Sequence, residues 1–172
     1  MNVVQINDLT YTYPGAAQPT LCHLSLEVEQ GDFLAIVGNN GCGKSTLCKA
    51  LNGLIPHFIA GDFSGQVLID GADTRESDVG ELARKVGYVY QDFENQIVRP
   101  TVLDDASYSC LNYAYPDYLE RGRTALAQCG LEGREEGIRS GSCPADRPTC
   151  LRWQVRCRWG LMCSFWMNRL PS

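Results

Sequence analysis

The sequence lacks any hydrophobic run long enough to cross a membrane. Its longest apolar stretch, around Phe33–Val37, has about six residues, whereas a membrane-spanning helix needs about 20. The first residues also lack the basic and apolar segments of a secretory signal, so we expect a cytoplasmic protein whose nine cysteines are thiols. Its 172 residues suffice for one domain with a hydrophobic core and are too few for two ordinary domains.

Basic residues are scarce over most of the chain. Residues 1–140 hold 10 Lys and Arg against 19 Asp and Glu, a net charge of −9. Because nucleic acids are bound mainly through their phosphates, this acidic balance argues against a nucleic-acid partner. Histidine is scarcer still. Neither His23 nor His57 has a cysteine or carboxylate at metal-ligand spacing, so we expect neither to bind a metal.

Lysine is absent from residues 141–172, and this segment differs from the rest in other ways. It holds five Arg and one Asp, all three Trp and four of the nine Cys. A break in composition of this kind indicates a boundary between two differently organised parts of the chain. We therefore divide the sequence into residues 1–140, a partial domain, and residues 141–172, which we call the tail.

Before the tail, the hydrophobic pattern changes twice. Stretches 3–13 and 24–29 alternate apolar with polar residues and predict half-buried strands. The run Phe33–Val37 is continuously apolar, which is typical of a strand buried on both faces of a parallel sheet. After a glycine-rich loop, apolar residues recur at helical spacing at Leu47, Ala50, Leu51 and Leu54. Further strands are predicted at 66–71 and 86–90 and helices at 77–85, 101–111 and 117–129, which together indicate an α/β fold.

The glycine-rich loop fits the pattern G-x-x-x-x-G-K-[ST], between a predicted strand and a predicted helix. Glycines allow the backbone to take positive φ values and to wrap closely around a ligand. Successive N–H groups and the helix N-terminus then point at phosphate oxygens. We expect Lys44 to reach the β- and γ-phosphates of ATP and the Ser45 hydroxyl to ligate Mg²⁺. The alternative is a glycine turn that binds nothing. The candidate nucleotide-binding residues are Gly38, Asn39, Asn40, Gly41, Cys42, Gly43, Lys44, Ser45 and Thr46.

The residues before the loop indicate which class of P-loop protein this is. Two strands precede the loop, and Tyr11-Thr12-Tyr13-Pro14-Gly15 resembles a segment of the ATP-binding subunits of ABC transporters, in which an antiparallel subdomain comes first. The resemblance implies that Tyr13 stacks on adenine; the alternative is a tyrosine that fills a strand face. A small-molecule P-loop kinase would instead have a lid with paired arginines, whereas Arg75, Arg84 and Arg99 are scattered.

A narrower resemblance covers Val86–Val98 and Thr101–Asp105. These segments are similar to the Q-loop region of the energy-coupling factor importers, ABC-like systems for vitamins, cobalt and nickel. The resemblance implies that Gln91 contacts Mg²⁺ or the attacking water and senses the membrane partner; otherwise Gln91 is a solvated strand end. Asp92-Phe93 departs from the Asn-Pro that is usual in that family.

The resemblance also implies an activity and partners. Such a subunit binds ATP and Mg²⁺ and works as one of a pair of ATP-binding subunits, in a homodimer or a heterodimer. It docks on a transmembrane coupling subunit at the inner face of the cell membrane, where ATP hydrolysis drives import of a vitamin or a metal ion.

The later motifs of the family are absent from the chain as written. An ABC ATPase needs a Leu-Ser-Gly-Gly-Gln signature, an apolar strand ending in Asp-Glu and a switch histidine, and none follows residue 136. We therefore assign no catalytic residue and expect the C-terminal part of the P-loop NTPase fold to be missing. The chain would then bind Mg-ATP weakly at most. A nucleotide-binding remnant without turnover is the alternative function.

Three interpretations of the tail are open. A zinc site is disfavoured because Cys143, Cys150, Cys157 and Cys163 include no C-x-x-C pair. A basic, aromatic membrane-surface segment is disfavoured because the arginines share no face with a matching apolar stripe. The tail has no sustained period and predicts no buried strand. The third interpretation is a shifted reading frame.

The genetic code tests the third interpretation. Each new codon takes the last base of one residue and the first two bases of the next. The codons of Met162 to Arg169 then permit Val-Leu-apolar-Leu-Asp-Glu-Pro, in which the second Leu, the Asp and the Glu do not depend on codon choice. In the same frame, Ser142 to Arg147 permit Leu-Ser-Gly-Gly-Gln. The signature and the strand ending in Asp-Glu therefore share one frame, which predicts one base lost, or two gained, between the codons of Leu131 and Ser142.

Overall fold

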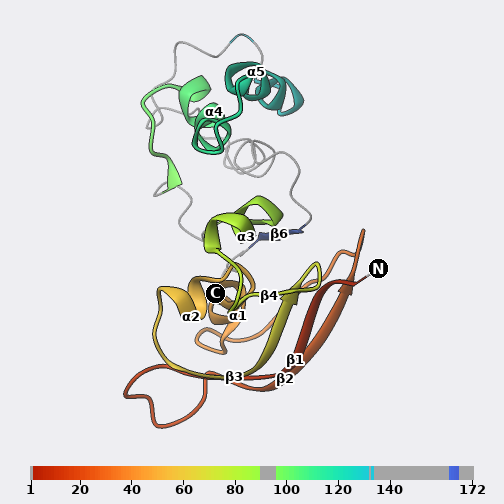
Figure 1. Ribbon diagram of the computed structural model, residues 1–172, viewed down its shortest axis with the longest axis vertical. Helices are drawn as coiled ribbons and strands as arrows, with labels where there is room; N and C mark the ends of the chain where they lie inside the picture. Colours follow the sequence, from red (N-terminus) through yellow and green to blue (C-terminus); the bar gives the residue numbers. More distant parts are fainter. Residues whose placement is uncertain (1, 90–95, 132, 134–162, 167–172) are drawn as a thin grey trace. The chain divides into compact units, whose positions relative to one another are not determined.

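The computed structural model describes residues 2–89, 96–131, 133 and 163–166, and the chain forms two compact units (Figure 1). Unit 1 comprises Met1–Gly87 and Leu161–Phe165, and unit 2 comprises Tyr88–Gly160 and Trp166–Ser172. Among the helices of the described residues, none has both the length and the hydropathy that a bilayer-crossing segment requires.

A four-stranded antiparallel sheet is the largest element of unit 1. Its spatial order is β2-β1-β3-β4, and its strands are β1 (Asn2–Thr12), β2 (Leu21–Glu29), β3 (Asp62–Ile69) and β4 (Ala72–Asp73). Val4, Ile6 and Leu9 of β1 are almost fully buried. A register irregularity at Asp8, whose φ is 54°, keeps Ile6 and Leu9 in the same core. The predicted N-terminal antiparallel subdomain is therefore confirmed.

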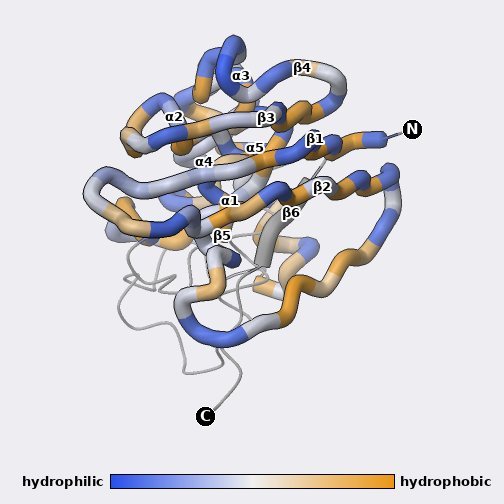
Figure 2. Tube along the Cα trace, turned by 90° about the horizontal axis from the view of Figure 1, so that it is seen from below, coloured by the Kyte–Doolittle hydropathy of each residue, from blue (hydrophilic) through white to orange (hydrophobic). Residues whose placement is uncertain are grey.

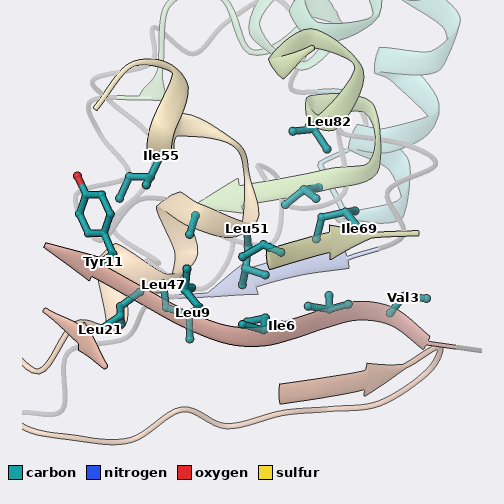
Figure 3. Close-up of a cluster of buried hydrophobic side chains, with 14 residues drawn as sticks. Val3, Ile6, Leu9, Tyr11, Leu21, Leu47, Leu51, Ile55, Ile69 and Leu82 are labelled. Carbon is teal, nitrogen blue, oxygen red and sulfur yellow. The ribbon is translucent and has the colours of Figure 1, made fainter. Parts of the chain in front are cut away.

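Three short helices belong to unit 1: α1 (Lys44–Leu51), α2 (Leu54–His57) and α3 (Val79–Lys85). Figure 3 shows their side chains meeting those of β1 and β3 in one hydrophobic cluster. The predicted helical stripe is confirmed at Leu47, Ala50 and Leu51, which are all buried. The helix is shorter than predicted because Gly53, at a φ of 76°, takes a left-handed conformation that ends it, so Leu54 begins α2 instead.

The apolar run Phe33–Val37 is not a strand, and the prediction of a doubly buried strand is wrong for this structure. Phe33 is 97% exposed and Val37 is 79% exposed. Figure 2 shows the run as a hydrophobic part of the connection from β2 to α1. A strand buried on both faces needs a neighbouring strand on each side to pair with its backbone. None of the described strands pairs with this run, so the backbone has no ladder to join.

The described residues of unit 2 form two helices, α4 (Val102–Asn112) and α5 (Tyr118–Gln128). Both were predicted at these places and are confirmed. They share a small core formed by Ala106, Ala125, Leu126 and Leu131. Thr101 caps α4, since its Oγ1 accepts a hydrogen bond from the Asp104 N–H at 3.1 Å and donates one to Asp104 Oδ2 at 2.6 Å.

A second sheet has two strands, β5 (Val86–Val89) and β6 (Cys163–Trp166). The strand predicted at 86–90 is thus confirmed over its described residues. β6 was not predicted, because four residues are too few to show a period. The rest of the tail, including Cys143, Cys150 and Cys157, lies outside the described residues.

Candidate nucleotide-binding site

The glycine-rich loop leads directly into the N-terminus of α1. Gly41 and Gly43 have φ values of 84° and 96°, a region that favours glycine. At Gly43 an added Cβ would also lie 2.8 Å from the carbonyl oxygen of Thr20, which leaves no room for a side chain. The sequence therefore needs glycine here to bring the loop around to the helix start.

The N-terminus of α1 has no side-chain cap and no acidic residue in its first turn. The first N–H groups of a helix have no partner within the helix, and they attract anions together with the helix dipole. A carboxylate or hydroxyl cap, like the one Thr101 provides for α4, would compete with a ligand for these donors. The residues present therefore fit a phosphate group.

Lys44 supplies the positive charge of the site. Its Nζ donates hydrogen bonds to the carbonyl oxygens of Gly38 at 2.7 Å and Asn39 at 2.8 Å, so the ammonium lies along the loop. The Sγ of Cys42 lies 3.5 Å from the same Nζ. Asn40, like most of the loop, is exposed. The structure thus brings the charge and the loop backbone together at one place.

The two hydroxyl residues after Lys44 differ in their surroundings. Ser45 is exposed, so its hydroxyl is accessible to a cation. Thr46 is only 5% exposed, and its Oγ1 lies 3.2 Å from the hydroxyl oxygen of Tyr13. Of the two, Ser45 is the one whose side chain is open to a metal–nucleotide complex.

Tyr13 is brought to the start of α1 from the far end of β1. Its ring makes an edge-to-face contact with Tyr11, with the ring centroids 4.9 Å apart. Tyr11 is fully buried and its hydroxyl donates to the carbonyl oxygen of Ala60 at 2.7 Å. Burial, with the neighbouring Tyr13, raises the pKa of Tyr11. Tyr13 is therefore held by a buried neighbour and by Thr46 in a half-buried position beside the loop.

Gln91 and its neighbours Asp92 and Phe93 lie outside the described residues, so its expected role is untested. Two residues that flank this segment, Gln96 and Asp105, belong to the matched motifs, but their roles were not predicted from the sequence. In unit 2, Gln96 Nε2 donates to the carbonyl oxygen of Tyr88 at 3.0 Å. Asp105 Oδ1 accepts hydrogen bonds from two backbone N–H groups, those of Val98 and Arg99, at 2.9 Å each.

Burial raises the pKa of Asp105, although its two N–H donors favour the charged carboxylate. The sequence placed Asp105 in the Thr101–Asp105 motif but did not show which groups its carboxylate would contact. Asp105 therefore orders the backbone just after the segment that carries Gln91.

A glycine loop with a lysine at an uncapped helix N-terminus, on an α/β fold, defines a P-loop nucleotide-binding domain. The family model for "ABC transporter" matches residues 21–142, which is most of the chain. The chain therefore belongs to the ABC transporter family, as an ATP-binding domain. This membership overturns the kinase alternative.

Relatives in sequence show the same family. A candidate ABC transporter ATP-binding protein of Pyrococcus horikoshii is 46% identical over 112 residues, which are 65% of this chain and 39% of that protein. The energy-coupling factor transporter ATP-binding protein EcfA1 of Lacticaseibacillus paracasei is 40% identical over 132 residues, 76% of this chain and 46% of that protein. The chain thus spans less than half the length of these relatives.

Solved structures show the fold. CbiO1 from Clostridium perfringens, part of the ABC transporter complex CbiONQ, superposes with a TM-score of 0.70 at 24% identity, over 91% of this chain and 62% of that chain. An ATP-binding cassette in a post-hydrolysis state, bound to ADP and Pi, gives a TM-score of 0.69 at 23% identity. This similarity supports the fold class independently of the sequence motifs.

Proposed function

We propose that the chain is the N-terminal part of the ATP-binding component of an energy-coupling factor importer. The observation that carries the nucleotide part is the uncapped N-terminus of α1, with Lys44 held against the loop carbonyls. The similarity to EcfA1 supports the importer type. The transported substrate in this proposal is a vitamin or a metal ion.

In this proposal each site residue has one role. Lys44 binds the β- and γ-phosphates, the loop N–H groups bind the remaining phosphate oxygens, and Tyr13 stacks on adenine. Ser45 ligates Mg²⁺, which when bound would neutralise charge on the phosphates. Thr46 holds Tyr13 through the 3.2 Å contact between their hydroxyl groups. Gln91 remains the proposed link to the metal and to the membrane partner.

The proposed partners follow from the family. A second ATP-binding subunit would complete a pair, and a transmembrane coupling subunit would hold the pair at the inner face of the membrane. The similar structure CbiO1 is part of the ABC transporter complex CbiONQ, which supports a partner of this kind. The acidic charge of residues 1–140 gives no support for a nucleic-acid partner.

We further propose that the tail is the product of a shifted reading frame and that this chain lacks ATP hydrolysis. The support is the joint appearance of the signature and of the strand ending in Asp-Glu in one alternative frame. Without that glutamate, no residue of the chain as written is a candidate for the general base. An inert nucleotide-binding remnant is the corresponding second function.

The nucleotide proposal is tested by thermal unfolding with and without Mg-ATP. We expect Mg-ATP to raise the melting temperature, because a ligand that binds only the folded state stabilises it. Lys44→Ala should abolish the increase. Lys49→Ala, on the same helix but outside the loop, is the matched control and should retain it. An increase that survives in Lys44→Ala would refute the assignment.

A further inference from the structure

Tyr11 is the largest fully buried side chain among the described residues, and it supports the ring of Tyr13. Tyr11 belongs to the hydrophobic cluster of Figure 3, whereas Tyr13 packs against that cluster and stays partly exposed. The two rings meet edge to face, with an interplanar angle of 84°. A partly exposed aromatic ring at the candidate site is therefore backed by a buried one.

Tyr11 is itself fixed at both ends. Its hydroxyl donates a hydrogen bond to the carbonyl oxygen of Ala60 at 2.7 Å, in the connection between α2 and β3. At the next residue, Gly61, an added Cβ would lie 2.5 Å from the hydroxyl oxygen of Tyr11, so the connection packs closely on the ring. The carbonyl oxygen of Tyr11 accepts a hydrogen bond from the Thr20 N–H at 2.8 Å. The ring of Tyr11 therefore cannot change rotamer without opening the core.

Three contacts within the chain hold Tyr13. Its carbonyl oxygen accepts a hydrogen bond from the Ala16 N–H at 3.0 Å, its ring lies against Tyr11, and its hydroxyl oxygen lies 3.2 Å from Thr46 Oγ1. A side chain that is ordered only when a ligand binds loses rotamer freedom at that moment, which weakens binding. A ring that is already ordered avoids this loss.

We propose that Tyr11 is a positioning residue for nucleotide binding, because it presets the ring of Tyr13 for contact with the base. The role rests on the proposed function, in which Tyr13 stacks on adenine. Tyr11 is 0% exposed, so it touches no ligand and acts only through Tyr13. Its effect should therefore concern the base of the nucleotide and leave the phosphates, which Lys44 and the loop bind, unaffected.

A comparison of Mg-ATP with magnesium tripolyphosphate separates the two parts of the ligand, because tripolyphosphate carries three phosphates and no base. Isothermal titration calorimetry of the full chain gives a Kd for each, and the ratio of the two Kd values measures the preference for the base. Tyr11→Leu removes the supporting ring and should weaken Mg-ATP binding by about three- to tenfold. Tripolyphosphate binding should not change, whereas a merely structural role would weaken both ligands alike.

Tyr11→Phe is the matched control. It keeps the ring that contacts Tyr13 and loses only the hydroxyl. The melting temperature should fall because the carbonyl oxygen of Ala60 loses its donor, but the preference for Mg-ATP should remain that of the parent chain.

A double-mutant cycle shows whether the effect passes through Tyr13. Tyr13→Ala removes the stacking ring and should weaken Mg-ATP binding by about tenfold or more. In that background Tyr11→Leu should cause no further loss, because the ring that it supports is already gone. A further loss of the same size as in the parent chain would overturn the positioning role.

A measurement on the parent chain keeps the proposal testable if Tyr11→Leu does not fold. Three-bond couplings in a chain with labelled tyrosine report the χ1 angle of Tyr13. A single rotamer before Mg-ATP is added, retained afterwards, supports the proposal, and averaging over several rotamers before addition overturns it.

The binding data can overturn the proposal in three further ways. These are a Tyr11→Leu chain that keeps the preference for Mg-ATP, one that folds but loses both ligands alike, and a Tyr11→Phe chain that loses the preference as fully as Tyr11→Leu. A parent chain that binds neither ligand would overturn the proposed function and the role of Tyr11 with it. A parent chain that binds both, with the same preference in Tyr11→Leu, would overturn the role of Tyr11 alone.

Discussion

Two apolar segments of unit 1 have opposite environments. β1 contributes Val4, Ile6 and Leu9 to the core, each at most 1% exposed, whereas Phe33 is 97% exposed. Both segments are rich in strand-forming residues and lie fewer than 30 positions apart in the chain. Their difference is therefore not one of intrinsic propensity.

The difference is in what each segment needs from its neighbours. β1 alternates in polarity, so it needs one covered face and pairing partners, and β2 and β3 pair with it. The run Phe33–Val37 needs cover on both faces, and no described strand pairs with it. A continuous apolar run therefore depends on more of the protein than an alternating one does.

The largest expected effect comes from restoring the reading frame. Insertion of one base between the codons of Leu131 and Ser142 should produce a chain with ATPase activity. The amides of residues 33–37 should then be protected from hydrogen exchange, because the strand ending in Asp-Glu becomes available to pair with them. Insertion of three bases at the same place keeps the present frame and should give neither. ATP hydrolysis and amide hydrogen exchange measure the two outcomes.

The DNA sequence provides a direct check on the same idea. The gene should read TGT at Cys143, GAC at Asp146, and AGA or AGG at Arg147, because only these codons give Leu-Ser-Gly-Gly-Gln in the other frame. Different codons, or an immediate stop in that frame, would contradict the frameshift.

The sequence predicted the elements whose partners lie nearby. The alternating strands of the first sheet, the stripe of α1 and the helices of unit 2 all pack against segments within the described residues. The burial of Phe33–Val37 was predicted wrongly. A continuous apolar pattern indicates that a segment would be buried between other elements, but it does not show whether strands that could pair with it are present.

The candidate site shows the same division. The loop at Gly38–Lys44 was predicted because glycine spacing and lysine position are local requirements. The contact of Tyr13 with Thr46, 33 residues away in the sequence, was not predicted because it depends on how β1 and α1 pack. Asp105 was matched as part of a motif, but its two backbone hydrogen bonds are visible only in three dimensions.

A substitution in the buried segment should have a large effect on stability. Leu51 is 1% exposed and lies in the cluster that joins α1 to β1. Leu51→Ala should lower the free energy of unfolding by about 2–5 kcal/mol, because it removes buried methyl groups and leaves a cavity. Leu51→Met, which nearly conserves volume, should cost less than about 1.5 kcal/mol. Urea unfolding measures both, and equal losses would contradict the cavity explanation.

Acid should weaken the sheet by a smaller amount. Arg75 donates hydrogen bonds to both carboxylate oxygens of Asp73 and lowers the pKa of Asp73 to about 2. A carboxylate whose pKa is lower in the folded state adds stability above its unfolded pKa of about 4, and this stability is lost as the pH falls toward 2. The expected loss is about 1 kcal/mol, reduced from the full pKa difference because Arg75 is partly exposed.

Urea unfolding at several pH values between 2 and 6 measures how much free energy of unfolding the Asp73–Arg75 pair contributes. Arg75→Gln removes the guanidinium, so the part of the pH dependence that belongs to the pair should shrink. An identical pH dependence in the parent chain and in Arg75→Gln would show that the pair contributes nothing.

The smallest effect is expected where the comparison began, at Phe33. Its side chain is almost fully exposed, so Phe33→Ser removes no contact from the core of unit 1. At concentrations low enough to keep the chain monomeric, the free energy of unfolding should change by less than about 0.5 kcal/mol. The measurement is urea unfolding beside Leu51→Ala under the same conditions. A loss comparable to that of Leu51→Ala would mean that Phe33 packs within the chain, and the contrast between the two segments would then fail. An unchanged value would show that the Phe33 side chain adds nothing to the stability of the single chain, as its exposure predicts.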